Sequence, residues 1–258
     1  MAPAPPGNPI TRDKYDAVLF DLDGVLTATA KVHAVCWKTM FDEYLQKRAV
    51  ETGETFRPFE IATDYTRYVD GKPRVDGVRD FLHSRGIQIA EGSPDDPPIV
   101  QTIHGLGNRK NEMVHQVIKA EGVETYEGSI QLVRHLRHQG IKTAVVSASH
   151  NAPEVLRAAK IADLFDARVD GAVASDLHLP GKPAPDTFLA AAQQLGVSPQ
   201  RAVVVEDALS GVQAGVTGGF GLVIGVARKG NAEEMKNYGA HLVVHDLGEL
   251  LTPSEPSS

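Results

Sequence analysis

Short apolar runs alternate with stretches of helical periodicity along most of the chain. The apolar runs are rich in β-branched residues and apolar on both faces, and they lie at 17–20, 141–146, 202–205, 221–226 and 242–244. Runs of this kind are typical of buried parallel strands. Amphipathic patterns predict helices near 128–139, 153–161, 185–195, 208–216 and 231–238. The alternation predicts a doubly wound parallel-sheet, Rossmann-like α/β core.

One segment between the first two predicted strands follows a different pattern. Long helical periods run through it at 31–47, 74–85 and 108–120, with no convincing buried strand. We therefore predict an all-helical module inserted after the first strand. The stretch from Gly86 to Gly107 contains Ser-Pro-Asp-Asp-Pro-Pro and is expected to be an exposed loop.

The expected domain organisation is a core interrupted by one insertion. Residues 15–28 and 122–250 would form the α/β core, and 29–121 would form the helical module. The Pro-rich start, 1–14, and the small polar end, 251–258, are expected to be disordered tails.

Composition and charge exclude several classes of protein. The 258 residues carry 26 Lys and Arg against 33 Asp and Glu, a formal net charge of −7, without a long basic run. We therefore expect neither nucleic acid nor an anionic membrane as a partner. Cys36 is the only cysteine, so no internal disulfide can form. The start of the chain lacks the apolar region of a secretory signal, and a cytoplasmic location is expected.

Acidic residues follow directly after the first predicted strand. Asp21 and Asp23 are two positions apart, so they face the same side of an extended segment. Both can stay ionised only beside a cation. In open α/β sheets, ligands bind at the carboxyl ends of the strands. The alternative interpretation is a polar turn at a strand end.

A second acidic pair follows the strand at 202–205. Glu206 and Asp207 would meet the first pair at the same edge of the sheet. Three or four carboxylates in one crevice predict a hard cation, and Mg²⁺ prefers such oxygen ligands. Capping of the helix at 208–216 is the alternative, and it explains one acid better than two.

Two further segments supply groups that bind anions. Ser147 and Ser149 precede a helix start, where backbone N–H groups, hydroxyls and the helix dipole attract an anion. Simple capping by Ser149 or Asn151 is the alternative. Lys182 lies in a Gly-Lys-Pro-Ala-Pro-Asp loop, where the prolines favour a fixed position over that of a solvated lysine. Together these groups describe phosphoryl transfer to a carboxylate nucleophile.

These motifs, in this order, resemble those of the haloacid dehalogenase superfamily over about residues 15–250. The resemblance implies that Asp21 is the nucleophile that becomes an aspartyl phosphate. It makes Asp23 the general acid and base, with a backbone carbonyl that helps to bind one Mg²⁺. The other implied ligands and phosphoryl-binding residues are Asp207 with Glu206 beside it, Ser147 and Lys182. The helical module would be the family's inserted α-helical cap.

Finer features resemble the β-phosphoglucomutase subfamily. They are Asp21-Leu-Asp-Gly-Val-Leu-Thr, His33, Trp37-Lys38, Gly71-Lys-Pro-Arg74, Arg109-Lys110-Asn111, Ser147-Ala148-Ser149-His-Asn151 and Gly181-Lys-Pro-Ala-Pro-Asp186. The resemblance implies that His33 steadies the acid/base Asp, that Arg74 binds the distal phosphate and that Lys110 contacts the sugar. The implied lining of the site is Ala148, Ser149, Asn151 and Trp37.

Each cap residue also has a plain structural interpretation. Trp37 could belong to the core of the helical module, and Arg74 could be a surface residue at a helix start. Two departures from the family pattern stand out. Gly181 replaces a Ser common before the Lys, and the loop 86–106 is longer than expected, which leaves its substrate contacts open.

The expected function is a β-phosphoglucomutase, which would act on a small phosphorylated sugar as a monomer. It would convert β-D-glucose 1-phosphate to D-glucose 6-phosphate through β-D-glucose 1,6-bisphosphate, which would also serve as primer. The alternative is a phosphatase of a small sugar phosphate or a related metabolite. A non-catalytic regulator is a third interpretation, and the intact acidic motifs argue against it.

Overall fold

The computed structural model describes residues 8–228 and 230–251. The chain divides into two compact units. One is the helical segment Thr29–Gly122, and the other is an α/β unit that combines the segments on either side of it. The expected tails fall partly on 1–7 and 252–258, which lie outside the described residues. Ile10, within the expected N-terminal tail, is fully buried.

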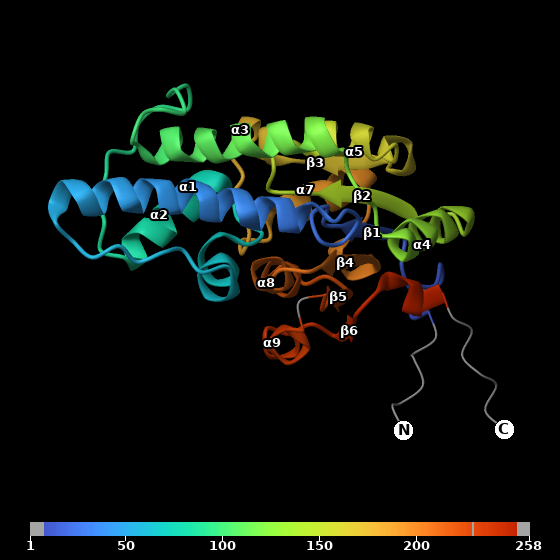
Figure 1. The fold of residues 1–258 in the computed structure, drawn as a ribbon. Coiled ribbons are helices and arrows are strands. Elements are labelled where there is room, and N and C mark those ends of the chain that lie inside the picture. Colours follow the sequence, from blue (N-terminus) through green and yellow to red (C-terminus); the bar gives the residue numbers. More distant parts are fainter. Residues whose placement is uncertain (1–7, 229, 252–258) are drawn as a thin grey trace. The chain divides into compact units, whose positions relative to one another are not determined.

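The described part of the α/β unit contains a six-stranded parallel sheet in the order β3-β2-β1-β4-β5-β6 (Figure 1). The strands are β1 (Ala17–Phe20), β2 (Lys142–Val146), β3 (Ala167–Val169), β4 (Ala202–Glu206), β5 (Leu222–Val226) and β6 (Leu242–Val244). The predicted α/β parallel-sheet fold is confirmed. The strand order reverses at β1, so the rule for open α/β sheets leads us to expect a ligand at the carboxyl ends of β1 and β4.

Strand β3 is absent from the sequence prediction. It has three residues, lies at the sheet edge and exposes Arg168, so it has no continuous apolar run. Central strands are different, since β1 is buried on both faces. Ala17 and Leu19 pack with Phe188 in one core cluster, and Phe20 makes an edge contact with Phe165.

Helices connect the strands, as the periodicity predicts. They are α4 (Glu127–His138), α5 (Ala152–Ala158), α6 (Gly171–Asp176), α7 (Asp186–Leu195), α8 (Leu209–Thr217) and α9 (Ala232–Asn237), with short 3-10 turns η2 (Ala162–Leu164), η3 (Pro199–Arg201) and η4 (Leu247–Leu251). Gly196 ends α7 in the left-handed conformation that favours glycine. The short α6 is not predicted.

The helical unit contains α1 (Thr29–Thr52), the π-helix η1 (Ile61–Val69), α2 (Arg74–Ser84) and α3 (Ile103–Glu121). Figure 1 shows α1 and α3 running side by side. Aromatic rings form its core: Phe41 stacks on Trp37 at 5.3 Å and lies 4.2 Å from Phe81, between ring centroids.

The predicted loop from Gly86 to Gly107 is wrong at its C-terminal end, because residues 103–107 belong to α3. Helix α3 begins at Ile103 because the Thr102 side chain caps it, accepting a hydrogen bond from the Gly105 N–H at 3.0 Å. The nine-residue π-helix η1 is also missed, because its geometry does not follow the 3.6-residue period. Across the described residues, we find no helix with the length and apolar character needed to cross a membrane.

Candidate active site

The candidate site begins where β1 ends. Phe20 is in register with Val205 of β4, and the Asp21 N–H continues the ladder by donating to the Val205 carbonyl at 2.9 Å. Asp21 therefore lies beside Glu206, the last residue of β4. Carboxylate oxygens of Asp21, Glu206 and Asp207 all lie within 4.8 Å of one another, and all three residues are buried.

Lys182 is the cation of this cluster. Its ammonium donates to Oδ1 of Asp21 at 2.6 Å and to Oε1 of Glu206 at 2.5 Å. A third bond goes to the Val146 carbonyl at 3.2 Å, at the end of β2. With an exposed fraction of 3 %, Lys182 is not a solvated loop lysine. Lys182, in the loop after α6, thus bonds to groups at the carboxyl ends of β1, β2 and β4.

Burial changes the ionisation of these groups. Burial raises the pKa of Asp21 well above its ordinary value, although Lys182 opposes this, and the neighbouring acids raise it further. The pKa of Glu206 is also raised by burial, with Lys182 acting in the opposite direction. Burial alone would lower the pKa of Lys182, but the two carboxylates raise it above its usual range. Burial and the neighbouring acids therefore favour the protonated forms of Asp21 and Glu206, and cations beside them favour the ionised forms.

A divalent cation fits the charge of the ionised cluster. Three buried carboxylates against one ammonium leave a formal charge of −2 when all are ionised. Hard oxygen donors are the ligands that Mg²⁺ prefers, and water and phosphate oxygens usually complete its coordination. The side chain of Asp23 is not in the three-residue cluster. The resemblance assigns it a backbone ligand, which remains a prediction.

Two glycines make room for the acids. Gly24 has φ +94°, and a Cβ there would lie 2.1 Å from Oδ2 of Asp207. A Cβ on Gly211 in α8 would lie 1.9 Å from Oε1 of Glu206. Both positions therefore require glycine, because any larger side chain would occupy the space of a carboxylate.

Ser147, directly after β2, lies close to Asp23. Its hydroxyl is 3.5 Å from Oδ2 of Asp23, and it accepts a bond from the Ser149 N–H at 3.1 Å. The Ser149 hydroxyl in turn accepts from the N–H of Asn151 at 3.1 Å. Ala148 lies between the two serines and is partly buried. These bonds fold the segment after β2 into a tight turn.

The residues at the N-cap positions of α8 and α5 make no side-chain capping bond. Ala208 is the N-cap of α8 and makes no side-chain capping bond. Its N–H instead donates to Oε2 of Glu206 at 3.0 Å, which holds Glu206 in the cluster. Asn151 is the N-cap of α5, also without a side-chain capping bond.

Sequence reasoning missed the residues that support the turn after Asp21. Arg228 follows β5 and donates to the Gly24 carbonyl at 2.9 Å, and its guanidinium lies 3.5 Å from the ring centroid of Tyr126. Ser129 in α4 donates to the Val25 carbonyl at 2.7 Å. The partners are about one hundred or more positions apart in the chain, so no local motif could reveal them.

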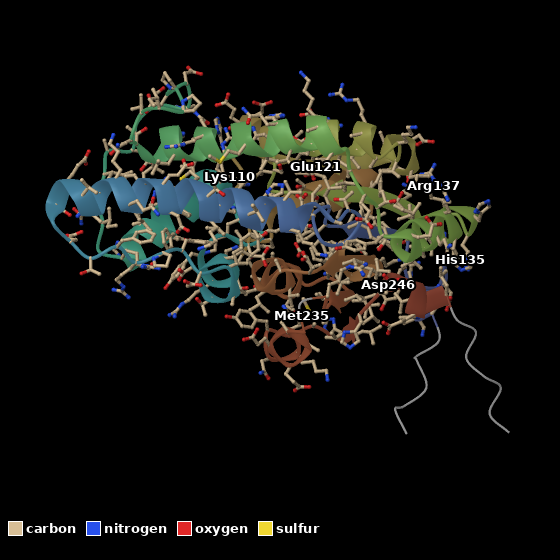
Figure 2. All side chains as sticks on the ribbon, in the orientation of Figure 1. Lys110, Glu121, His135, Arg137, Met235 and Asp246 are labelled. Atoms are coloured by element: carbon tan, nitrogen blue, oxygen red, sulfur yellow. The ribbon has the colours of Figure 1, made fainter. Side chains whose placement is uncertain are left out.

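Three predicted residues meet inside the helical unit. The Lys110 ammonium on α3 lies 2.7 Å from Nδ1 of His33 on α1 and 4.9 Å from the Trp37 ring centroid. Figure 2 labels Lys110 on α3. An ammonium can only donate, so Nδ1 of His33 accepts. Trp37 is 3 % exposed and packs in the aromatic core.

Arg74 begins α2, as the Pro73-Arg74 motif predicts. Its Nη2 donates to Oδ1 of Asn108 at 3.1 Å. In the part of the chain that the structure describes, Arg74 pairs with no carboxylate, and its buried Nε has no hydrogen-bond partner. Burial lowers the pKa of Arg74. Its charge is thus available to an anion.

Comparison with known proteins identifies the family of this chain. Residues 15–219 match the haloacid dehalogenase-like hydrolase family. The chain is 50 % identical over 242 residues to a β-phosphoglucomutase of Mycobacterium tuberculosis, covering 93 % of this chain and 92 % of the relative. A Bacillus subtilis β-phosphoglucomutase is 31 % identical over 235 residues, 91 % of each chain.

A solved structure shows the same architecture. The crystal structure of a β-phosphoglucomutase from Clostridium difficile matches with a TM-score of 0.72 and 26 % identity, covering 92 % of this chain and 93 % of the other. The protein described here belongs to the haloacid dehalogenase-like hydrolase family, in its β-phosphoglucomutase-like branch, and is an enzyme, a phosphotransferase or phosphatase.

Proposed function

We propose that this enzyme is a β-phosphoglucomutase that works through an aspartyl phosphate on Asp21. It would interconvert β-D-glucose 1-phosphate and D-glucose 6-phosphate through β-D-glucose 1,6-bisphosphate. One observation supports the mutase over a hydrolase: the 50 % identity to a β-phosphoglucomutase runs through the helical unit as well as the sheet. The phosphoryl chemistry rests on the buried Lys182–Asp21 pair.

In the first half-reaction, a carboxylate oxygen of Asp21 attacks the phosphorus on C1 of bound β-D-glucose 1,6-bisphosphate, and D-glucose 6-phosphate is released. The new bond joins phosphorus to Asp21, and the bond from phosphorus to the sugar oxygen breaks. Asp23 gives its proton to that leaving oxygen. In the second half-reaction, Asp23 takes a proton from the free 6-hydroxyl of β-D-glucose 1-phosphate. That oxygen attacks the phosphoryl group on Asp21, which forms the 1,6-bisphosphate again and restores the Asp21 carboxylate.

Lys182 has two tasks in this scheme. It holds Asp21 as a carboxylate, because its ammonium offsets a charge that burial disfavours. It also offsets the charge on the phosphoryl oxygens when they enter the site. Ser147 and the turn through Ala148, Ser149 and Asn151 would supply hydroxyl and amide groups to the same oxygens.

One Mg²⁺ ion would be held by Asp21, Asp207 and Glu206, with the Asp23 backbone carbonyl. When bound, it supplies charge neutralisation for the phosphoryl oxygens. The fit rests on the buried oxygen donors, which have a formal charge in excess of their lysine.

The helical unit would act as the cap of the enzyme. Arg74 would bind the second phosphate, Lys110 and Trp37 would contact the sugar, and His33 would steady Asp23. A mutase must protect its aspartyl phosphate from water, and a closing cap does so. We also propose that the enzyme is cytoplasmic and monomeric. Sedimentation of the purified protein can check the monomeric state.

³¹P NMR tests this proposal directly. The enzyme would be incubated with Mg²⁺ and β-D-glucose 1-phosphate, with and without a trace of the 1,6-bisphosphate. A mutase gives D-glucose 6-phosphate, faster with the bisphosphate, and little free phosphate. Rapid release of phosphate with no isomer would identify the phosphatase alternative. Asp21→Asn is the control and should abolish both reactions.

A further inference from the structure

Asn108, which the sequence motifs do not include, lies between Arg74 and the long loop 86–102. It occupies the second turn of α3 and is half-buried. Its Oδ1 accepts from Nη2 of Arg74 at 3.1 Å. Its Nδ2 donates to the carbonyls of Pro94 at 2.9 Å and Asp96 at 3.0 Å. Since both amide hydrogens and the amide oxygen are used, the orientation of the amide is fixed.

The loop is itself held in place on both sides of these carbonyls. The Thr102 hydroxyl, which caps α3, also donates to Oδ2 of Asp96 at 2.5 Å. At its other end, Glu91 pairs with Arg79 of α2 at 2.5 Å. The Pro94 and Asp96 carbonyls, which accept from the Asn108 amide, are therefore held in place. Through these bonds the loop fixes the Asn108 side chain, which in turn orients the Arg74 guanidinium.

A neutral side chain suits this position. An amide oxygen orients a guanidinium without cancelling its charge, whereas a carboxylate would form a charged pair and compete with an incoming anion. Among the described residues, Arg74 has no carboxylate partner. The guanidinium is thus oriented by a neutral group and keeps its full charge for a ligand.

We propose that Asn108 is a positioning residue that ties the loop 86–102 to Arg74 and holds its guanidinium ready for the second phosphate of a sugar bisphosphate. This inference rests on the proposed function, since it takes the distal-phosphate role of Arg74 from there. It gives the long loop a part in substrate selection: the loop favours substrates that carry two phosphates over those that carry one.

The test compares a ligand with two phosphates and a donor with one. Binding of β-D-glucose 1,6-bisphosphate is measured by calorimetry with Mg²⁺ in the Asp21→Asn background, where no turnover occurs. We expect Asn108→Ala to raise Kd about tenfold, as loss of a hydrogen bond to a charged group does. Asn108→Asp should raise Kd further. Hydrolysis of acetyl phosphate by the otherwise unchanged enzyme should stay within about twofold for both variants.

A double-mutant cycle separates positioning from general damage. If Asn108 acts through Arg74, Asn108→Ala should change Kd by less than about twofold in an Arg74→Ala background. Gln116→Ala is the matched control, because it removes an exposed amide from the same helix α3 and leaves the hydrogen bonds of Asn108 in place. It should leave Kd within about twofold.

Some outcomes overturn the inference. Equal losses on the bisphosphate and on acetyl phosphate, or additive effects of the two alanine variants, would show that Asn108 only supports the fold. If Arg74→Ala raises Kd and Asn108→Ala does not, the inference alone fails. If Arg74→Ala leaves Kd unchanged, the distal-phosphate role in the proposed function fails as well. Isomerisation by the wild-type enzyme is measured separately by ³¹P NMR.

Discussion

The ammonium of Lys182 lies 2.6 Å from Oδ1 of Asp21, with both groups buried at the carboxyl end of β1. The pair joins positions 161 residues apart in the chain. Asp21 is ionised, and able to act as a nucleophile, only as far as neighbouring cations offset its burial. Lys182 provides this offset in the protein itself.

Replacing Lys182 with methionine should destabilise the metal-free protein by about 3–5 kcal/mol at pH 7, because it leaves buried carboxylates without their cation. The loss should be smaller at pH 5, where Asp21 and Glu206, whose pKa values are raised, take up protons. Urea unfolding with EDTA at both pH values measures this. Lys236→Met is the control, since its pair with Glu233 is exposed, and it should change stability by under about 1 kcal/mol.

Mg²⁺ should stabilise the protein more at high pH than at low pH. Folding raises the pKa of Asp21 above 3.8 and that of Glu206 above 4.5. Their contribution to stability is therefore present below these values and is lost as pH rises through the pKa values of the folded state. Mg²⁺ binds the ionised forms and reverses this loss.

At a Mg²⁺ concentration of about 100 times Kd, the stabilisation is about 2.7 kcal/mol. In a chain of this size we expect Tm to rise by about 5–10 °C at pH 8. The rise should shrink toward pH 5 and should be weakened by Asp207→Asn. A Tm shift that does not depend on pH, or that survives Asp207→Asn, would contradict a site built from these acids.

Gly24→Ala should weaken both folding and metal binding. The backbone has φ +94°, and the new Cβ would lie 2.1 Å from Oδ2 of Asp207, so the acid must move. Gly140→Ala is a matched control, since its φ is +72° with no atom within 4 Å of the new Cβ. We expect Gly24→Ala to destabilise by about 1–3 kcal/mol more than the control and to raise the Mg²⁺ Kd, measured by calorimetry.

Arg228→Ala should release the turn that follows Asp21. Arg228 donates to the Gly24 carbonyl at 2.9 Å and to Oδ2 of Asp246 at 2.8 Å. Loss of these charged hydrogen bonds should destabilise by about 2–3 kcal/mol and lower kcat in the protein that remains folded. Arg137→Ala removes a more exposed pair with Asp166 and should leave kcat unchanged. Figure 2 labels Asp246 and Arg137.

The candidate site residues at strand ends were predictable, because open α/β sheets bind their ligands at the carboxyl ends of the strands. Asp21 and Glu206 stand at the ends of apolar runs typical of buried strands. Because β1 and β4 are parallel neighbours, their carboxyl ends bring the two acids together. The short strand β3 was not predictable, since an edge position needs no apolar run.

Supporting residues were not predictable either. Arg228 and Asn108 are polar residues without a local pattern, and their meaning depends on partners in other elements. Asn108 stands directly before the recognisable Arg109-Lys110-Asn111 segment, yet only the folded loop shows what its amide holds. Their roles come from tertiary hydrogen bonds, which sequence patterns do not record.

The insertion of the helical unit between β1 and β2 also sets the order in which the chain can fold during synthesis. The chain leaves and re-enters the sheet unit at one point, where Ala28 donates to the Glu124 carbonyl and Thr27 bridges to Thr125. β1 emerges first, and its partners in the described sheet, β2 and β4, are made later. The helical unit is one continuous segment, so on a ribosome its core can form before β2 is made. During that time the apolar strand β1 has no strand to pair with.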